Sequence, residues 1–244
     1  MTIDRYFEAI LSILEKLRDE ERSSIEAASE ACARSIANGG IIFIHDTGHI
    51  INHELVARAG GLVGLTPFSF DLNTGQANSF RSRDPSNQPP PIGEIIALAL
   101  RKANAKAGDI LIIGSVSGKT FGPVELAIQA KKAGLTVIAV TSTEHSRALE
   151  SEHTSGKRLF EACDIVIDNH APPGDAILEI DGLDRKVCPA SGICAVVSMW
   201  AMTAGIVEKL IAMDKIPSIY RSVNLPGGLE DVRKVEEEYA KRGY

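Results

Sequence analysis

One stretch of this sequence, residues 109–141, constrains the fold more than any other. Two short apolar runs rich in β-branched residues, 110–113 and 137–140, are typical of buried strands. The residues between them place an apolar stripe on a helix of about three turns that ends at Gly134. Strand, helix and strand in this order form a βαβ unit, so we expect a parallel sheet covered by helices.

The turn between the first of these strands and the helix reads Ser115-Val116-Ser117-Gly118-Lys119-Thr120. It combines three hydroxyl groups with a glycine that permits close approach of the backbone. The first N–H groups of the following helix have no partner within that helix. Hydroxyls and free N–H groups both donate to a negative charge, so the turn predicts an anion site with phosphate as its ligand.

Two kinds of protein have a turn similar to this one. The nucleotide-binding P-loop needs four residues between its glycines, whereas Gly114 and Gly118 enclose three. The segment 164–168 could still serve as the acidic strand that holds magnesium in such a protein. The sugar isomerase (SIS) domain has a phosphosugar turn of the form Ser-x-Ser-Gly-x-Thr, and residues 115–120 match it at every defined position. The sequence therefore resembles the SIS family more than the P-loop proteins.

Composition sets broad limits on the fold and its partners. A chain of 244 residues with 44% hydrophobic residues can bury one substantial core. The net charge of −6 and the lack of a basic cluster argue against a nucleic-acid partner. The four cysteines are widely spaced with no CxxC pair, which favours buried thiols over disulfides or a zinc site.

No secretory signal is expected, because Asp4, Glu8 and Glu15 interrupt the N-terminal apolar residues. The uncharged segment 187–207 is only weakly apolar by membrane standards and is more typical of a central buried helix. We therefore expect a cytoplasmic protein that spans no membrane.

The rest of the chain predicts alternating helices and strands. Residues 3–38 are expected to form one long helix or two, either packed on the sheet or used in dimerisation. Segment 71–91 has no periodicity and predicts a long loop, either a functional lid or a mobile segment. Further helices are expected over 50–59, 92–105, 145–163, 190–213 and 229–242. Strands are expected over 41–44, 62–70 and 165–167, and an edge strand or a hairpin over 177–180.

Other segments resemble one branch of the SIS family, small bacterial proteins similar to phosphoheptose isomerases. These segments are Arg58-Ala-Gly-Gly-Leu62, Glu152-His153-Thr-Ser-Gly156-Lys157, Asp168-Asn-His-Ala-Pro-Pro-Gly-Asp175-Ala176 and Ser222-Val-Asn224. The resemblance covers nearly the whole chain and implies a flavodoxin-like α/β fold, a three-layer αβα sandwich around a five-stranded parallel sheet. It also implies a single SIS domain over 1–244, with an N-terminal helix over 1–38 and a C-terminal helical extension over 217–244.

The resemblance implies a catalytic role for Glu54. In the related heptose isomerases a glutamate on the helix after the first turn shuttles the proton, and Glu54-Leu-Val-Ala-Arg58 is similar to that helix. Aldose–ketose isomerisation moves a proton between neighbouring carbons, which one carboxylate with a raised pKa can do. The alternative is a surface salt bridge between Glu54 and Arg58, four residues further on.

Two features depart from the relatives. Their first turn usually reads Gly-x-Gly-x-Ser, where this chain has Asp46-Thr47-Gly48-His49-Ile50. Their last long helix carries a histidine, and this chain has Trp200 at the corresponding position. His49 lies after a strand, at the end where α/β proteins bind ligands, and is the candidate acid catalyst. His53 is expected to be a surface residue, whereas His153 is expected to reach a neighbouring subunit's site.

A metal site is the less favoured use of these histidines. His49 and His53 have a helical zinc spacing, with Glu54 and Asp46 nearby, but no third ligand is obvious. No metal and no cofactor are therefore expected. The substrate-binding residues assigned with this resemblance are Thr47, Gly48, Ser115, Ser117, Gly118, Lys119, Thr120, Ser142, His153, Ser191 and Asn224.

The expected function is isomerisation of a phosphorylated sugar by a homodimer or homotetramer, because the uncharged helix from Ala190 would leave an apolar patch on a monomer. A second possibility is a lyase similar to the muramic acid phosphate etherases, which share the domain and also begin with removal of an α-proton. A third is a phosphosugar sensor without catalysis. The altered first turn and the missing histidine favour a sensor or altered chemistry, whereas Glu54 favours catalysis.

Overall fold

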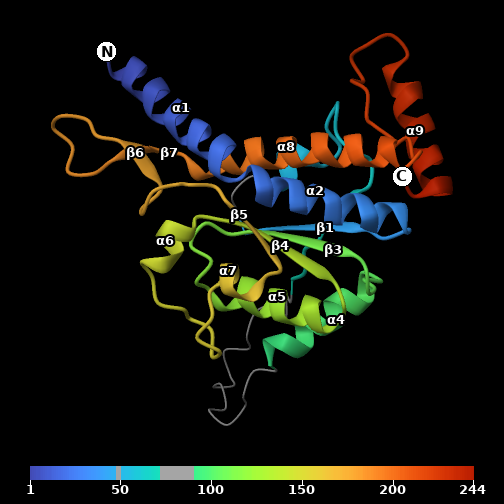
Figure 1. The fold of residues 1–244 in the computed structure, drawn as a ribbon, viewed down its shortest axis with the longest axis horizontal. Helices are drawn as coiled ribbons and strands as arrows, with labels where there is room; N and C mark the ends of the chain where they lie inside the picture. The colour runs from blue at the N-terminus through green and yellow to red at the C-terminus, as the bar shows by residue number, and fades with distance from the viewer. Residues whose placement is uncertain (48–50, 72–90) are drawn as a thin grey trace, which may run out of the picture.

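The computed structural model describes residues 1–47, 51–71 and 91–244. Figure 1 shows a central sheet between two layers of helices. The sheet consists of β1 (Ile42–Asp46), β2 (Leu65–Pro67), β3 (Ile110–Gly114), β4 (Thr136–Thr141) and β5 (Ile165–Asp168). All neighbours are parallel, in the order β2-β1-β3-β4-β5. The predicted α/β fold with a five-stranded parallel sheet is confirmed.

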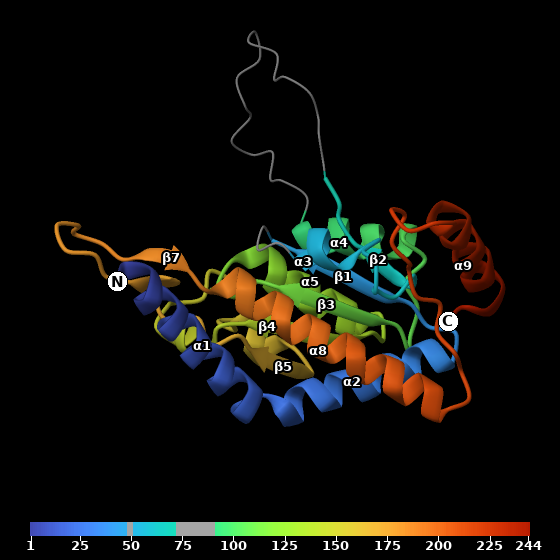
Figure 2. The same ribbon diagram turned by 90° about the horizontal axis from the view of Figure 1, so that it is seen from above.

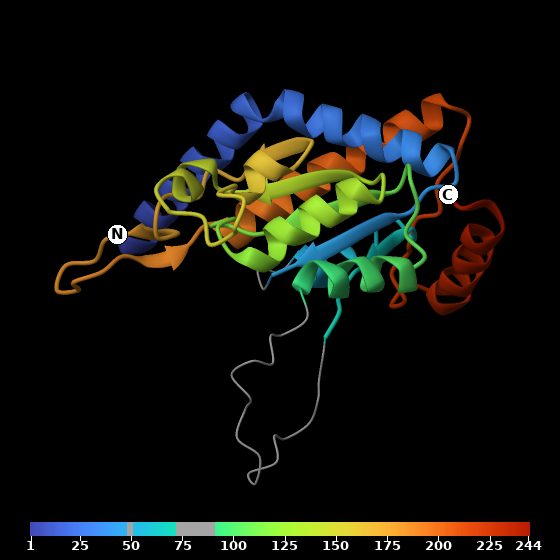
Figure 3. The same cartoon turned by 90° about the horizontal axis from the view of Figure 1, so that it is seen from below.

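The two faces of the sheet bury separate apolar clusters. Ile42 and Ile44 of β1 pack with α2 (Arg22–Ala37), α3 (Ile51–Leu55) and α8 (Ser191–Ala212). Phe43, between them in sequence, packs on the other face with α4 (Ile92–Lys102), α5 (Phe121–Lys132) and α7 (Leu159–Ala162). Figures 2 and 3 show these two helical layers from opposite sides. Because both faces are covered, the strands read as continuous apolar runs.

The N-terminal residues form two helices, α1 (Thr2–Glu20) and α2, which meet at Glu21. Helix α2 lies along α8, whereas α1 continues past the sheet and contacts a hairpin of β6 (Ala176–Leu178) and β7 (Val187–Pro189) (Figure 1). These two strands pair antiparallel, which confirms the hairpin expected at 177–180. The arm of α1 and hairpin extends beyond the layers of the sandwich.

Helix α8 is the one helix, among the residues that the structure describes, with the length and composition to cross a membrane. It packs along α2, and Met199, Met202 and Ile206 belong to the apolar cluster on that face of the sheet. One face of α8 is therefore part of the core, whereas Ile193, Val197 and Ile211 are exposed, so the expectation of a central buried helix holds for one face only. After α8 the chain ends in α9 (Gly228–Arg242), close to the helix expected at 229–242.

The helix predicted over 145–163 is wrong for its middle part. The structure has the short helices α6 (Thr143–Arg147) and α7, with a loop between them. Within the loop the Ser151 hydroxyl donates to the carbonyl oxygen of Lys157, and the Lys157 N–H donates to the Ser155 hydroxyl. Gly156 has φ +72°, which a helix does not allow. Serine hydroxyls that bond the nearby backbone compete with helical hydrogen bonds, and here they prevail.

Two other predicted elements are shorter in the structure. Helix α3 ends at Leu55 instead of residue 59, because Ala57 has a left-handed φ of 54°. Strand β2 begins at Leu65 instead of residue 62, because Leu62 forms an antiparallel bridge with Ile219, in the segment that precedes α9. The predicted loop at 71–91 lies mostly outside the described residues.

Candidate functional site

The strand order places the switch point of the sheet between β1 and β3. The chain leaves β1 toward α3 on one face and leaves β3 toward α5 on the other, so the two turns separate at the carboxyl edge. Ligands of open α/β sheets bind at such a point. Thr47 ties the turns together, since its N–H and its hydroxyl donate to the Gly114 carbonyl oxygen at 3.3 and 2.9 Å. The predicted phosphate turn starts directly after Gly114.

Gly118 fixes the shape of this turn. Its φ is +54°, and a Cβ at this position would lie 3.0 Å from the Cβ of Leu159 and 3.3 Å from Oγ1 of Thr141. Both the backbone conformation and the close packing therefore favour glycine. The carbonyl oxygens of Gly118 and Lys119 accept the N–H groups of Leu159 and Glu152 at 2.7 and 2.9 Å. The turn is thus anchored through its acceptors.

The donors of the turn remain available. For residues 117–120, no backbone N–H and no hydroxyl has a hydrogen-bond partner in the part of the chain that the structure describes. Thr120 is the N-cap residue of α5, but its hydroxyl makes no capping bond. Free N–H groups at the start of a 12-residue helix attract an anion, because the helix dipole adds positive potential there.

Lys119 does not add a free positive charge to the turn. Its Nζ atom lies 2.7 Å from Oε1 of Glu152. In a P-loop the equivalent lysine reaches the phosphates, whereas here a carboxylate balances it. Asp168 is not free for magnesium either, because its carboxylate accepts the Thr143 hydroxyl and the N–H groups of Thr143 and His170.

His153 lies in the loop between α6 and α7 and belongs to a buried hydrogen-bond network that includes Glu125 of α5. Its Nε2 is 2.7 Å from Oε2 of Glu125, and its Nδ1 is 2.7 Å from the Ser155 hydroxyl. Nδ1 also accepts the Ser155 N–H, so in the neutral ring the proton is on Nε2 and is donated to Glu125. Burial alone would raise the pKa of Glu125, but hydrogen bonds from Gln129 and His153 outweigh it and lower that pKa.

The position of His153 argues against the expectation that it reaches a neighbouring subunit's site. Its side chain is only 4% exposed, and both ring nitrogens have partners in their own chain. The Phe121 ring also covers the imidazole, with 4.5 Å between centroids. Sequence reasoning could not see this, because Glu125 is distant in sequence and shows no pattern that links it to His153.

Ser142 and Ser191 are buried, and their hydroxyls form hydrogen bonds at the first residues of α6 and α8. The Ser142 hydroxyl donates to the carbonyl oxygen of Ala171 and accepts the His145 N–H at the start of α6. The Ser191 hydroxyl donates to Asp175, whose carboxylate also accepts backbone N–H groups at the start of α8. Ser142 directly follows β4, on the same edge of the sheet as the phosphate turn.

Asn224 does not lie with the other predicted site residues. It is exposed and follows Ile219, whose partner Leu62 precedes the start of β2, at the amino edge of the sheet. Figure 2 shows α9 and the segment before it at the end of the molecule away from β7. The assignment of Asn224 to this site is therefore corrected for a single chain. A short motif carries no information on which edge of the sheet it reaches.

Glu54 lies on α3 and forms the predicted surface ion pair. Its Oε2 is 3.1 Å from a guanidinium nitrogen of Arg58, and the two side chains are 39% and 52% exposed. His53 is exposed, as expected. Gly48 and His49 lie outside the described residues, and so does any zinc site built on His49. Among the described residues, no group of three metal-ligating side chains is arranged to hold a metal ion.

Sequence reasoning did not single out His45 or Asp175. His45 is the next-to-last residue of β1, and Asp175 holds the first residues of α8. His45 could have been found from the sequence, because it is a titratable residue directly after the apolar run of β1, at the carboxyl end of the strand. Asp175 lies in a segment that was quoted for its resemblance only, and its capping role needed the position of α8.

The fold and this turn define the class of protein. Residues 5–142 match the family described as SIS domain, and the chain belongs to this family. It is 35% identical to the UPF0309 protein of Streptomyces griseus subsp. griseus, over 98% of this chain and 95% of the relative. It is 34% identical to the UPF0309 protein of Caldanaerobacter subterraneus subsp. tengcongensis, over 98% of each chain.

Two solved structures show a similar fold. A phosphoheptose isomerase from Francisella tularensis aligns with a TM-score of 0.53 and 16% identity, over 84% of this chain and 95% of that one. The NanR protein of Vibrio vulnificus, solved as a complex with ManNAc-6P, aligns with a TM-score of 0.51 and 10% identity, over 99% of this chain and 69% of that one. At these identities the likeness concerns the fold alone.

Proposed function

We propose that this protein binds a phosphorylated sugar at the carboxyl edge between β1 and β3, with the phosphate on residues 115–120. The observation that carries the proposal is the set of N–H and hydroxyl donors at 117–120 that have no hydrogen-bond partner among the described residues. Hydrogen bonds to the carbonyl oxygens of Gly118 and Lys119 hold this turn in place. Because Glu152 balances Lys119, the anion is held mainly by N–H and hydroxyl groups. Within this fold, the NanR protein of Vibrio vulnificus has been solved with a sugar phosphate.

The reaction that we propose is aldose–ketose isomerisation with Glu54 as the proton shuttle. Glu54 lies on the short helix α3, which follows the turn after β1. Its carboxylate would remove a proton from the carbon next to the carbonyl and return it to the neighbouring carbon. The ion pair with Arg58 does not prevent this role, because an exposed i,i+4 pair contributes only about 0.3–0.5 kcal/mol.

A phosphosugar sensor is the second candidate, and the same ion pair is the observation that favours it. Glu54 is partly exposed, and its carboxylate is already paired with the Arg58 guanidinium on the same face of the chain's surface. The last long helix offers Trp200 at the position of the relatives' histidine. A lyase remains a third candidate, since it would begin with the same α-proton removal.

Thermal unfolding with a panel of aldose, ketose and etherified sugar phosphates separates these functions. We expect sugar phosphates to raise the unfolding temperature more than inorganic phosphate or ATP does. A ligand found in this way is then incubated in ²H₂O. Deuterium at the carbon next to the carbonyl with turnover indicates an isomerase, loss of an ether substituent indicates a lyase, and binding without exchange indicates a sensor.

The double variant Ser117→Ala/Thr120→Ala tests the phosphate turn itself. Each lost hydrogen bond to a charged group should cost about 1 kcal/mol or more, so we expect affinity to fall at least tenfold. The control Thr2→Ala/Ser23→Ala removes two exposed hydroxyls from α1 and α2 and should leave binding unchanged. Unchanged affinity in the first double variant would contradict the proposed site.

A further inference from the structure

His45 stands at the switch point with one ring nitrogen unused. It is the next-to-last residue of β1 and pairs in register with Ile113, two residues before Ser115. Side chains alternate along a strand, and Phe43 faces α4 and α5, so His45 faces the same side. The phosphate turn crosses to α5 on this side. His45 is half-buried, so part of its ring is open at the carboxyl edge.

The protonation pattern of the neutral ring follows from a single contact. Nδ1 of His45 lies 2.9 Å from the carbonyl oxygen of Phe68. A carbonyl oxygen can only accept, so Nδ1 must carry the proton. Nε2 of the neutral ring is then a lone-pair acceptor. Within the residues that the structure describes, no hydrogen-bond partner of Nε2 is found.

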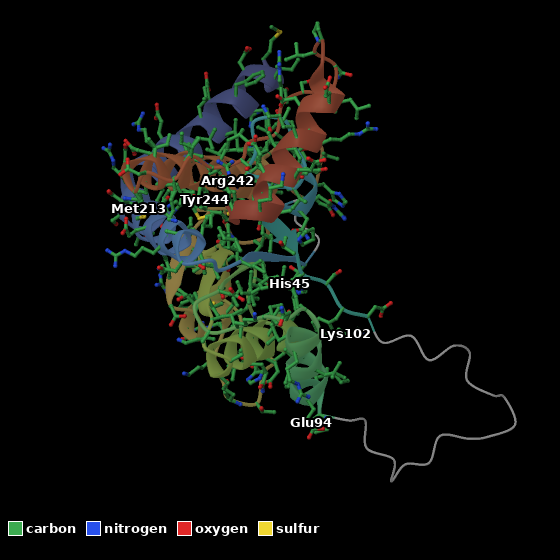
Figure 4. The ribbon with its side chains drawn as sticks, turned by 90° about the vertical axis from the view of Figure 1, so that its right-hand side faces the viewer. His45, Glu94, Lys102, Met213, Arg242 and Tyr244 are labelled. Carbon is green, nitrogen blue, oxygen red and sulfur yellow. The ribbon has the colours of Figure 1, made fainter. Side chains whose placement is uncertain are left out.

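Aromatic neighbours hold the ring in place. The Phe68 and Phe70 rings both lie 6.2 Å from it between centroids, and Phe70 is nearly parallel to it at 18°. Figure 4 shows His45 beside the segment that continues from β2. A basic nitrogen on an oriented ring at a ligand edge is the arrangement needed for proton transfer. The described His153 and His170 have side chains only 4% and 7% exposed.

We propose that Nε2 of His45 contacts the sugar and carries the second proton of the isomerisation, an inference that rests on the proposed function. In the open-chain sugar, Glu54 takes the proton from C2 while Nε2 of His45 takes the proton from the C2 hydroxyl. The carbonyl oxygen at C1 receives that proton back from His45, and C1 receives the proton from Glu54. One proton moves from carbon to carbon and one from oxygen to oxygen, so the step needs no other reactant.

Two substitutions separate this role from the structural one. The amide nitrogen of His45→Asn can still donate to the Phe68 carbonyl, as Nδ1 does, but the variant has no Nε2. His45→Gln places an amide where Nε2 was and loses the bond to Phe68. We expect the Asn variant to fold and to keep its affinity for the sugar phosphate within threefold, while turnover falls about 100-fold or more. The Gln variant should lose both turnover and thermal stability.

Nitrogen-15 NMR of the wild-type imidazole gives an independent readout. The free protein should show the tautomer with hydrogen on Nδ1. The Nε2 resonance should move when the best sugar phosphate of the panel is added, and it should not move with saturating inorganic phosphate. A turnover of the Asn variant equal to wild type, or an unmoved Nε2 resonance with bound sugar phosphate, would overturn the role of His45 alone.

The proposed function can fail separately. If no sugar phosphate binds the wild-type protein, the proposed function and this inference fail together. If one binds without hydrogen exchange, the isomerase is excluded and so is proton transfer by His45. Isomerisation by wild type with full activity in His45→Asn leaves the proposed function intact and refutes only the second proton carrier.

Discussion

At the scale of single residues, the phosphate turn depends on one backbone conformation. Gly118 adopts φ +54° while it packs against Leu159, and this shape leaves the following N–H groups free for an anion. The sequence pattern predicted a glycine because it permits close approach of the backbone. The structure adds that the close neighbour is Leu159 of the same chain, which a Cβ at position 118 would meet.

Gly118→Ala should expose this dependence. A left-handed φ costs an alanine about 1–2 kcal/mol, and the new methyl group at 3.0 Å from Leu159 forces a further shift. We expect the free energy of unfolding to fall by about 1–3 kcal/mol and phosphosugar affinity to fall with it. Chemical denaturation measures the first effect and calorimetric titration the second.

Gly122 offers a matched control four residues further along the chain. It lies in the first turn of α5, and a Cβ there would meet nothing within 4 Å. Gly122→Ala should therefore leave stability unchanged or raise it by up to about 1 kcal/mol, since alanine is the better helix former. Equal effects of the two substitutions would contradict the account of Gly118.

Glu54→Gln tests the proton shuttle at the same scale. Shape and volume change little, so fold and phosphosugar binding should persist, while an amide is too weak a base for proton removal. We expect turnover and deuterium incorporation to fall by orders of magnitude. If Glu54 is only a partner of Arg58, stability should change by a few tenths of a kcal/mol and turnover should persist.

At the scale of elements, the loop between α6 and α7 is fastened to α5. The Glu125–His153 contact at 2.7 Å joins them, and the next residue back, Glu152, bonds the phosphate turn through its N–H and its carboxylate. The same loop therefore positions His153 and supports residues 118–119. We expect the network of Glu125 and His153 to stabilise the turn without contacting the ligand.

The Glu125 carboxylate makes this link dependent on pH. Its pKa in the folded protein is below its ordinary value of 4.5, so its stabilising contribution is complete above pH 4.5 and is lost as the pH falls through the lowered value. Glu125→Gln should cost about 1 kcal/mol at pH 7 and reduce the loss of stability as the pH falls below the ordinary value of 4.5. Urea denaturation across this range measures both effects.

Glu144→Gln is the control for this measurement, because Glu144 is an exposed carboxylate on α6. It should leave the acid dependence close to that of the wild-type protein. An acid dependence of Glu125→Gln equal to wild type would show that the buried pair does not contribute to the stability of the loop.

At the scale of the whole molecule, α1 and α8 present an exposed apolar surface. Phe7 and Leu11 of α1 are each 56% exposed, and Ile193 and Val197 of α8 are 40% and 38% exposed. A groove of about 930 Å³ lies between α1, α2 and α8, lined in part by Leu14 and Val197. Exposed apolar surface of this kind marks protein contacts, in line with the expected homodimer or homotetramer.

Substitution on this surface tests the assembly. We expect sedimentation at micromolar concentration to show a dimer or tetramer for the wild-type protein and a monomer for Phe7→Glu/Leu11→Glu, because burying two carboxylates in an apolar contact is unfavourable. Leu98→Glu, at a residue of α4 that is 58% exposed, should leave the assembly unchanged. A monomeric wild-type protein would contradict the expected assembly.

Local patterns in the sequence were sufficient for the sheet and for the turn at 115–120 that connects β3 and α5. Continuous β-branched runs specify strands that are buried on both faces, and the hydroxyl-rich turn with Gly118 lies within six consecutive residues. The strands depend on burial alone, and the turn depends on residues that are close together in the sequence. The loop at 148–158 shows the limit, since the competition of the Ser151 and Ser155 hydroxyls with helical hydrogen bonds was not evident from the periodicity of the sequence.

Only the tertiary structure decided which side chains meet. The partners Glu125 and His153 are separated by 28 residues, and His45 and Phe68 by 23, so no spacing rule links either pair. Strand order placed Thr47 against Gly114 at the switch point, whereas the path of the chain after α8 carried Asn224 to the other edge. The sequence by itself determined the class of fold and the position of the turn for which we propose anion binding. Packing between distant segments determined the surroundings of that turn, because side-chain contacts depend on three-dimensional distance and not on position along the chain.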